Sequence, residues 1–177
     1  MTASRSGTVS HERCRLWYET YGAAVYRYLR FHVESADTAE DLTADVFLRA
    51  LEAADRWDPE RAEARVWLFG IARNLLRDHR RRTRVRRHVA IGEFRDLVCD
   101  APSAEERLLA EERIARLLAA VARLPEAERE LLALRYGSGM TTAEIADVLT
   151  VREAAVRTRL WRAMGRLRHL LEKEDQG

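Results

Sequence analysis

Apolar residues recur at helical spacing through most of the chain. Steps of three and four positions place such residues on one face of an α-helix. The first segment with this spacing begins at His11, and its apolar positions are Leu16, Trp17, Tyr21, Val25, Tyr28 and Leu29. Two further segments carry Leu42, Val46, Phe47, Ala50 and Leu51, and, from about Arg61, Val66, Trp67, Phe69, Ile71, Leu75 and Leu76. Because no alternating strand pattern accompanies them, we predict an all-α fold.

Start and stop signals divide these helices into two groups. Asp37 followed by Glu40 predicts a helix start, because these side chains can bond the free N–H groups of a first turn. Pro59 ends that helix, since the residue before a proline avoids the helical region. Residues 88–103 lack clean periodicity, and we predict a flexible linker there. The predicted order is a disordered tail, a first helical domain, the linker, a second helical domain and a short tail, over residues 1–9, 10–87, 88–103, 104–172 and 173–177.

The second domain ends in a short helix, a tight turn and a long helix. Thr141 with Glu144 forms a capping box that opens the short helix. A turn over residues 150–152 follows, and the long helix covers residues 153–171. This order is typical of a helix-turn-helix unit, in which the first helix braces a second helix that lies in the major groove of DNA.

The long helix has one apolar face and one face rich in arginine. Its predicted buried residues are Val156, Leu160, Met164 and Leu167. Arginine pairs with guanine or phosphate, and threonine can touch a base or a thymine methyl group. We therefore propose as DNA-contacting residues Arg152, Arg157, Thr158, Arg159, Trp161 and Arg162. The alternative interpretation is an ordinary surface helix in a bundle, which pattern alone leaves open.

Charge is distributed unevenly along a chain whose net charge is only +2. Residues 12–60 contain 6 arginines and 11 acids, whereas residues 61–90 contain 10 arginines and 2 acids. A second basic stretch, residues 151–177, has 7 basic and 4 acidic residues. Clustered cations indicate a polyanionic partner, although a single cluster is more often a solvated helix face. Two clusters, each joined to a suitable fold signal, favour nucleic acid.

Few residues suggest chemistry. Cys14 and Cys99 lie far apart in sequence and form neither a zinc motif nor a disulfide framework, so we interpret them as free thiols in a reducing compartment. His11 and Glu12 lack the second histidine of a zinc-protease helix. The chain has no membrane-length apolar run and no signal-peptide core. We expect a cytoplasmic protein that is not an enzyme and has no metal site, no cofactor, no small-molecule substrate and no direct membrane insertion.

Residues 124–171, LPEAERELLALRYGSGMTTAEIADVLTVREAAVRTRLWRAMGRLRHLL, resemble a known DNA-reading domain. The resemblance is to the promoter −35 reading domain of extracytoplasmic-function sigma factors, which are members of the sigma-70 family. The matching features are Leu124-Pro125-Glu126, Leu134-Arg135-Tyr136, Glu144-Ile145-Ala146, Val156-Arg157-Thr158-Arg159-Leu160 and Arg162-Ala163. The chain departs from the family at Thr150, where glycine is usual in the turn, and at Ala154-Ala155, where Gly-Thr is usual.

Residues 39–82 resemble the core-binding and −10 reading domain of the same family. The matching features are Ala39-Glu40-Asp41-Leu42, Asp45-Val46-Phe47-Leu48-Arg49-Ala50, Trp67-Leu68, Ile71-Ala72-Arg73-Asn74, Asp78 and Arg80-Arg81-Arg82. The resemblance implies that the acidic helix binds the clamp helices of the polymerase β′ subunit, through Asp41, Asp45, Val46, Leu48 and Arg49. It also implies that the next helix and the loop before it open and read the −10 element, through Trp57, Arg61, Arg73, Asn74, Arg77, Arg80 and Arg81.

The resemblance implies an RNA polymerase sigma factor that directs promoter-specific transcription initiation. Its expected partners are core RNA polymerase, at the β′ clamp helices and the β flap, promoter DNA, and an anti-sigma factor. A groove for the flap tip is expected at Leu117, Val121, Leu131 and Leu132, where the simpler interpretation is internal core. The main alternative is a stand-alone helix-turn-helix regulator that binds duplex operators as a dimer. A helical adaptor that binds only protein is disfavoured by the arginine-bearing final helix.

Overall fold

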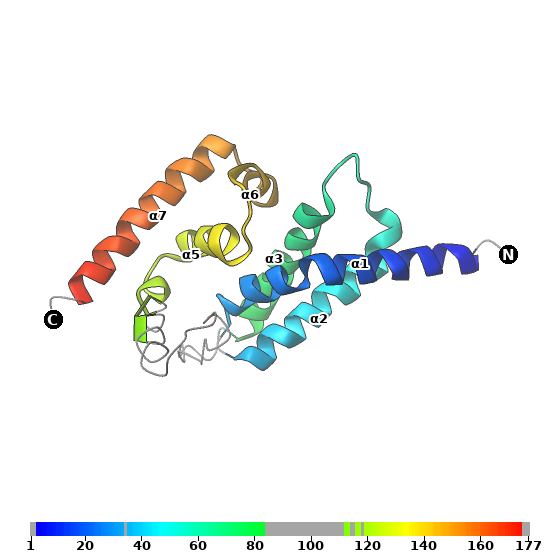
Figure 1. The fold of residues 1–177 in the computed structure, drawn as a ribbon, viewed down its shortest axis with the longest axis horizontal. Coiled ribbons are helices and arrows are strands. Elements are labelled where there is room, and N and C mark those ends of the chain that lie inside the picture. Colours follow the sequence, from blue (N-terminus) through cyan, green and yellow to red (C-terminus); the bar gives the residue numbers. More distant parts are fainter. Residues whose placement is uncertain (1–2, 34, 84–111, 114–115, 118, 175–177) are drawn as a thin grey trace, which may run out of the picture.

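The computed structural model describes residues 3–33, 35–83, 112–113, 116–117 and 119–174. Helices, turns and short connections account for these residues, and none of them lies in a β-strand. The all-α prediction is therefore confirmed for the described part of the chain. Figure 1 shows two groups of helices, one from each half of the sequence. The linker predicted at residues 88–103 lies outside the described residues.

The N-terminal lobe is built from three long helices and one short 3-10 turn. These elements are α1 (Ala3–Arg30), α2 (Ala36–Ala53), η1 (Ala54–Arg56) and α3 (Ala64–Thr83). The three helices pack against one another, and their fully buried side chains include Val25, Tyr28, Leu29, Val46, Leu68 and Phe69. Each such side chain stabilises the fold by about 1.5–3 kcal/mol relative to an exposed one, which makes this lobe a rigid support for surface residues.

The structure corrects several expected boundaries in this lobe. The N-cap of α2 is Ser35, whose hydroxyl accepts from the Thr38 backbone N–H at 3.0 Å, so Asp37 lies inside the first turn. Helix α1 begins at Ala3, so the described part of the predicted tail continues a helix that Ser10 anchors by a 2.5 Å hydrogen bond to Asp55. Helix α3 begins at Ala64 rather than near residue 61, because residues 58–62 form a turn.

Two residues of α1, Leu16 and Cys14, were interpreted from the sequence, and the structure shows their surroundings. Leu16 was expected on the apolar face of α1, but it is 59% exposed, whereas the adjacent Trp17 is buried. Cys14 is a free thiol that contacts the Phe47 carbonyl oxygen at 3.4 Å, and partial burial raises its pKa. Cys99 lies outside the described residues. No helix in the described ranges is both long enough and apolar enough to cross a bilayer.

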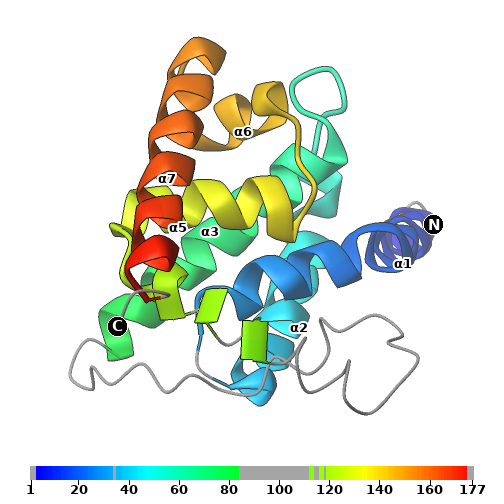
Figure 2. The ribbon, with the colours of Figure 1, turned by 60° about the vertical axis from the view of Figure 1, so that its left-hand side comes forward.

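The C-terminal lobe contains the expected helix-turn-helix. Its named elements are α5 (Glu126–Leu132), the π-helical turn η3 (Ala133–Gly137), α6 (Thr142–Leu149) and α7 (Glu153–Glu174). Figure 2 shows α7 crossing α5, with α6 near the N-terminal end of α7, and α7 contacts both α5 and α6. The capping box predicted at Thr141 and Glu144 is confirmed, with both reciprocal hydrogen bonds present. Met164 was expected to be buried, but it is 36% exposed. Ala163 is buried in its place, because positions 156, 160, 163 and 167 form the inner stripe of α7.

The turn between α6 and α7 is made without glycine. Thr150 ends α6 in the left-handed conformation, with φ 55° and ψ 50°. Glycine adopts this region without cost, whereas a β-branched residue is strained there. The Val151 N–H bonds the Ala146 carbonyl at 2.9 Å and closes the turn. The departure from the family at this position therefore leaves the tight turn intact.

The two lobes are in direct contact. Arg27 of α1 donates through Nε to the Gly137 carbonyl at 3.0 Å. A Cβ placed on Gly137 would lie 3.0 Å from the Phe31 ring, so glycine lets these two segments approach closely. Helix α3 contacts α6 and helix α1 contacts η3, and Figures 1 and 2 both show the C-terminal lobe beside the N-terminal lobe. The sequence left open whether the domains close on each other, and in this structure they do.

Candidate nucleic-acid interface

The outer face of α7 is open to solvent. All six proposed −35 residues are exposed, and the side chain of Trp161 is 78% exposed. The inner face of the helix is held by Val156, Leu160 and Leu167, which are buried against the rest of the lobe. A packed stripe therefore orients the opposite, arginine-bearing face outward, and this is the geometry that a helix needs to enter a major groove.

Local contacts pre-organise the start of this helix. The Glu153 carboxylate accepts from the Thr142 hydroxyl at 2.6 Å and from the Arg157 guanidinium at 2.7 Å. These hydrogen bonds, with the Thr142 bond as the largest cause, lower the pKa of Glu153. The Thr142 bond fastens α6 to the first turn of α7, so the two helices of the unit keep a fixed relative position. Arg157 is still 59% exposed and remains accessible to a phosphate.

The arginines of α3 are arranged differently, because two of those proposed to hold DNA contact the other lobe. Arg73 donates through Nε to the Glu130 carboxylate of α5 at 2.8 Å. Arg80 pairs with Glu126 at the start of the same helix. Both arginines were expected to hold DNA, and in this structure both are bound to carboxylates. Asn74, Arg77 and Arg81 of α3 are exposed, and Arg81 lies 3.5 Å from Asp78 of its own helix.

A third ion pair between the lobes joins residues that the sequence did not single out together. Arg65 of α3 donates to the Glu144 carboxylate at 3.0 Å, and it also bonds the Ser138 carbonyl. Burial raises the pKa of Glu144, but hydrogen bonds from Thr141 and the nearby Arg65 outweigh it and lower the pKa overall. Glu144 thus closes the capping box of α6 and binds the other lobe. Arg65 belongs to the basic stretch, and that is the only sequence signal that could have drawn attention to it.

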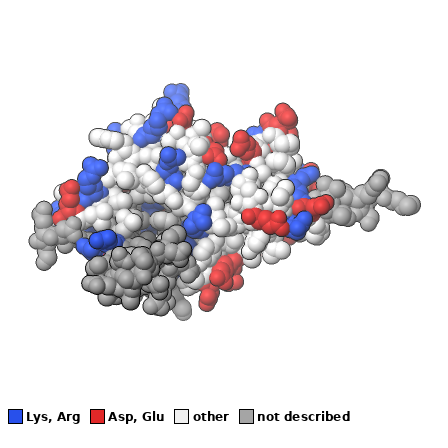
Figure 3. Space-filling model, in the orientation of Figure 1, with Lys and Arg blue, Asp and Glu red and all other residues white. Residues whose placement is uncertain are grey.

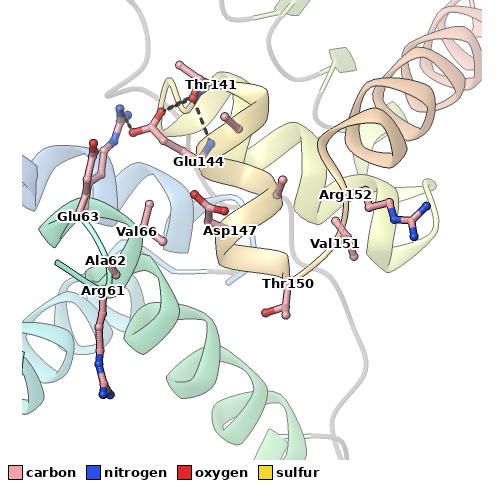
Figure 4. A pocket seen from close by; sticks show the side chains of 13 residues that line it. Arg61, Ala62, Glu63, Val66, Thr141, Glu144, Asp147, Thr150, Val151 and Arg152 are labelled. Carbon is pink, nitrogen blue, oxygen red and sulfur yellow. Dashed lines mark hydrogen bonds and ion pairs between the residues drawn. The ribbon is translucent and has the colours of Figure 1, made fainter. Parts of the chain in front are cut away.

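These residues border an open cleft of about 1060 Å³ between the lobes. Figure 4 shows Arg61, Ala62 and Glu63 on one side and Asp147, Thr150 and Arg152 on the other. Both walls carry mixed charge, so the cleft has no clear preference for an anion. It marks where the loop before α3 and the helix-turn-helix face each other.

A histidine lies at the same junction. The Nδ1 atom of His32 accepts from Arg80 at 2.7 Å, and its ring contacts Tyr28 at a centroid distance of 5.0 Å. Its Nε2 atom is buried without a hydrogen-bond partner among the described residues. Burial, followed by the positive charges of Arg80 and Arg129, lowers the pKa of His32 well below its ordinary value. The ring is therefore neutral at pH 7, and a proton there would face two guanidinium groups.

The loop before α3 is closed by internal hydrogen bonds. The indole N–H of Trp57 donates to the Ala62 carbonyl at 3.1 Å, and the Trp57 ring lies against Trp17 and Trp67. Arg61, in contrast, has 87% of its side chain exposed and lies 3.5 Å from Asp58. Of the two loop residues expected to contact DNA, the structure presents Arg61 to solvent and uses Trp57 inside the lobe.

The acidic helix α2 presents a charged surface with one apolar residue. Asp41, Asp45 and Arg49 are exposed, and Leu48 is 58% exposed among them. Val46 was expected to belong to this surface, but its side chain is completely buried in the lobe. On a helix, two residues apart in sequence differ by about 200° in direction, so Val46 and Leu48 cannot share one face. The candidate polymerase-binding surface narrows to Asp41, Asp45, Leu48 and Arg49.

The flap groove expected in the C-terminal lobe is mostly internal core. Val121, Leu131 and Leu132 are at most 5% exposed, and of the four residues only Leu117 is open to solvent.

On the visible face of Figure 3, basic side chains gather over α7, and acidic ones lie mainly over α1, α2 and the loop before α3. No group of three or more potential metal-ligating side chains occurs among the residues that the structure describes.

Comparison with known proteins agrees with this arrangement. Sigma-70 region 2 matches residues 17–86, and Sigma-70, region 4 matches residues 114–167. The RNA polymerase sigma factor NccH of Alcaligenes xylosoxydans is 33% identical over 162 residues, which are 89% of this chain and 86% of NccH. The ECF RNA polymerase sigma factor BldN of Streptomyces coelicolor is 38% identical over 154 residues, which are 87% of this chain and 58% of BldN. The chain therefore belongs to the sigma-70 family, among the extracytoplasmic-function sigma factors.

Solved structures support the same fold. CnrH, in complex with the cytosolic domain of CnrY, superposes with a TM-score of 0.69 at 24% identity and covers 97% of this chain and 95% of its own. RpoE of Bartonella quintana, in complex with the anti-sigma factor NepR, gives a TM-score of 0.65 at 23% identity over 89% and 96% of the two chains. Membership of the family favours a sigma factor over a stand-alone dimeric regulator.

Proposed function

We propose that the chain binds core RNA polymerase and directs it to promoters by reading a −10 and a −35 element. The observation that carries this proposal is the combination of two different basic surfaces on one chain, an exposed arginine face on α7 and an arginine-bearing helix α3 behind a loop. A regulator that binds only duplex DNA has no need for the second surface. The protein acts as an initiation factor in the cytoplasm and not as an enzyme.

The −35 element is read by α7 in the major groove. Arg159 and Arg162 lie on the exposed face, where guanidinium groups can bond guanine bidentately. Arg152 and Arg157 sit near the N-terminal end of the helix, where contacts to phosphate fix its register. Thr158 and Trp161 add contacts to base edges and methyl groups.

The −10 element is opened and read by α3 and the loop before it. Arg61 projects from the loop, and Asn74 is exposed on α3, where its amide can bond the edge of an unstacked base. The arginines of α3 hold the sugar-phosphate backbone of the separated strand. Arg77 and Arg81 are exposed for this role, whereas Arg73 and Arg80 must first leave Glu130 and Glu126.

Reading both elements requires the lobes to separate. The −10 and −35 elements lie about 25 base pairs apart, which at 3.4 Å per base pair is about 85 Å along the duplex. In this structure α3 touches α6 through the 3.0 Å Arg65–Glu144 pair, so the two reading surfaces are far closer than that. The predicted linker at residues 88–103, fully extended, reaches about 55 Å, and α7 itself is about 33 Å long. The linker and the lobes together can therefore span the promoter.

The surface on α2 binds the clamp helices of the polymerase β′ subunit. An apolar residue, Leu48, exposed among acidic side chains suits a partner that offers a small apolar hollow bordered by basic residues. The contact to the β flap belongs to the C-terminal lobe. An anti-sigma factor restrains the free chain, as the solved complexes of CnrH with CnrY and of RpoE with NepR suggest by analogy.

The division of labour is tested with Asp45→Ala in a reconstituted system. We expect the affinity for core polymerase to fall about two- to tenfold, because one charged contact is lost at an interface rim. Binding to −35 duplex should stay unchanged, since α2 lies in the other lobe. The matched control is Glu12→Ala, which removes an exposed acid from α1. Loss of DNA binding by Asp45→Ala, or an equal effect of the control on core binding, would contradict the assignment.

The function itself is tested by pull-down of core polymerase with the purified chain, followed by run-off transcription from genomic DNA. Stable core binding with new promoter-specific transcripts is the expected result, and the transcripts reveal both promoter elements. The opposite result is dimeric binding to duplex operators without core binding, which would favour a stand-alone regulator.

A further inference from the structure

Three tryptophans hold both ends of the loop before α3. The Trp57 ring, at the start of the loop, meets Trp17 of α1 at a centroid distance of 5.1 Å and an interplanar angle of 83°. Trp67, in the first turns of α3, meets the same Trp17 ring at 5.4 Å. Trp57 and Trp67 are also near each other, at 6.5 Å. One buried ring of α1 therefore anchors the entry and the exit of the loop together.

Hydrogen bonds fix the shape of the loop between those anchors. The Trp57 indole N–H donates to the Ala62 carbonyl at 3.1 Å and closes the loop from Trp57 to Ala62. Inside the loop, the Asp58 carboxylate accepts from the Glu60 N–H at 3.0 Å. The backbone carbonyl of Asp58 accepts from the Arg61 N–H at 3.1 Å. The loop is a closed turn, and the indole hydrogen bond joins residues farther apart in sequence than the two bonds inside it.

A second residue of α1, Arg13, also contacts Trp57. The Arg13 guanidinium lies 5.6 Å from the centroid of the Trp57 ring, within the range of a cation–π contact. The same side chain donates to the Ala54 carbonyl at 3.2 Å. Arg13 thus joins η1, which ends α2, to the ring that begins the loop. Both the ring and the N–H group of Trp57 are engaged within the protein.

We propose that Trp57 is a positioning residue that sets the conformation of residues 58–62 for the −10 strand, and that it does not itself contact DNA. The inference rests on the proposed role of this loop in reading −10. Its physical reason is that a loop held in its bound shape does not have to be ordered when the strand binds, so affinity is retained. Arg61, 87% exposed at the outer edge of the turn, is the side chain that the brace presents.

The test uses Trp57→Phe in the reconstituted holoenzyme, on a promoter identified from its own transcripts. Phenylalanine keeps an aromatic ring in the cluster but removes the N–H bond to Ala62. Open-complex formation, followed by permanganate reactivity of unpaired thymines in the −10 region, should fall about fivefold, the factor that one hydrogen bond typically contributes. Affinity for core polymerase and for −35 duplex should not change.

Two further variants make the result decisive. Trp67→Phe trims the same cluster and leaves the Trp57–Ala62 bond in place, so it should form open complexes as the wild type does, below the unfolding temperature of all variants. Arg61→Ala tests whether the loop reads −10 at all. If Arg61→Ala lowers opening and Trp57→Phe does not, or if Trp57→Phe and Trp67→Phe act equally, the positioning role is wrong. If neither Arg61→Ala nor Trp57→Phe has an effect, the proposed function of the loop is wrong as well.

Discussion

The two helices that carry the proposed DNA-binding arginines differ in what those arginines touch. On α7, Arg157 pairs with Glu153 of its own helix, and the neighbouring Arg159 and Arg162 are exposed. On α3, Arg73 and Arg80 pair with Glu130 and Glu126 of the other lobe. The proposed arginines of α7 are therefore all exposed to solvent, whereas two of those on α3 are held in ion pairs with the other lobe.

The difference has a physical consequence for the free chain. A carboxylate and a phosphate offer a guanidinium similar charge-assisted hydrogen bonds, so exchanging one for the other costs little by itself. The exchange also breaks the contact between the lobes, including the bond from Arg27 to the Gly137 carbonyl. We therefore expect −35 binding to be a property of the lobe alone, and −10 binding to depend on lobe separation.

The largest expected effect comes from Arg159→Ala on α7. Losing a bidentate contact to a base should weaken binding to −35 duplex by about 1–3 kcal/mol, or roughly five- to 150-fold. Binding of a −10 single strand should be unaffected, because Arg159 is exposed on α7, in the lobe that does not carry the proposed −10 residues. Fluorescence anisotropy with the two DNA probes checks both statements. Equal losses on both probes would remove the distinction between the helices.

A smaller effect of opposite sign is expected for Glu130→Gln on α5. The substitution weakens the hold on Arg73, and the affinity of the free chain for a −10 single strand should rise about two- to fivefold, as expected for one partly exposed ion pair. The matched control is Glu128→Gln on the same helix, whose carboxylate lies 3.2 Å from Arg166 of α7 within the C-terminal lobe. An equal rise in the control, or no rise in Glu130→Gln, would count against competition between carboxylate and DNA.

The smallest effect concerns pH and His32. The pKa of His32 is lowered in the folded chain, mainly by burial. The folded state is therefore at its full stability with respect to this group above pH 6.5, the ordinary pKa of histidine, and it loses stability as the pH falls toward the folded pKa. The slope from this one group is at most about 1.4 kcal/mol per pH unit. Urea unfolding between pH 7.5 and 5.5 should show a shallower loss of stability in His32→Asn, which keeps an acceptor for Arg80. Identical slopes in both proteins would exclude His32 as the cause.

Local features of the fold were predictable because their signals lie within a few residues. Apolar spacing located α2 and the apolar core of α7, and the Thr141–Glu144 capping box marked the start of α6. The same reasoning failed where residues close together in sequence offered two choices. Val46 and Leu48 are two positions apart, and only packing decides which one faces inward. Likewise Ser35 and Asp37 are both acceptable caps, and only the structure selects Ser35.

Contacts between distant segments were not predictable from one sequence. Arg73 and Glu130 are 57 positions apart, and Arg65 and Glu144 are 79 apart, so neither pair leaves a periodic signal. Trp57 shows the same limit, because the resemblance implied a DNA contact for this residue, whereas in the structure its indole N–H group is bonded to the Ala62 carbonyl. The sequence identified the surfaces by residue type, whereas the partners of each side chain depend on tertiary structure.

The measurement that tests the account most directly is the distance between the lobes in solution. Cysteines at the exposed positions Ala23 of α1 and Ala127 of α5 carry a donor and an acceptor dye, in a chain in which Cys14 and Cys99 are replaced by serine. We predict efficient energy transfer in the free chain and a large decrease when core polymerase and promoter DNA are added. Low transfer in the free chain, or transfer that is unchanged on promoter binding, would contradict a closed free state that opens to read both elements.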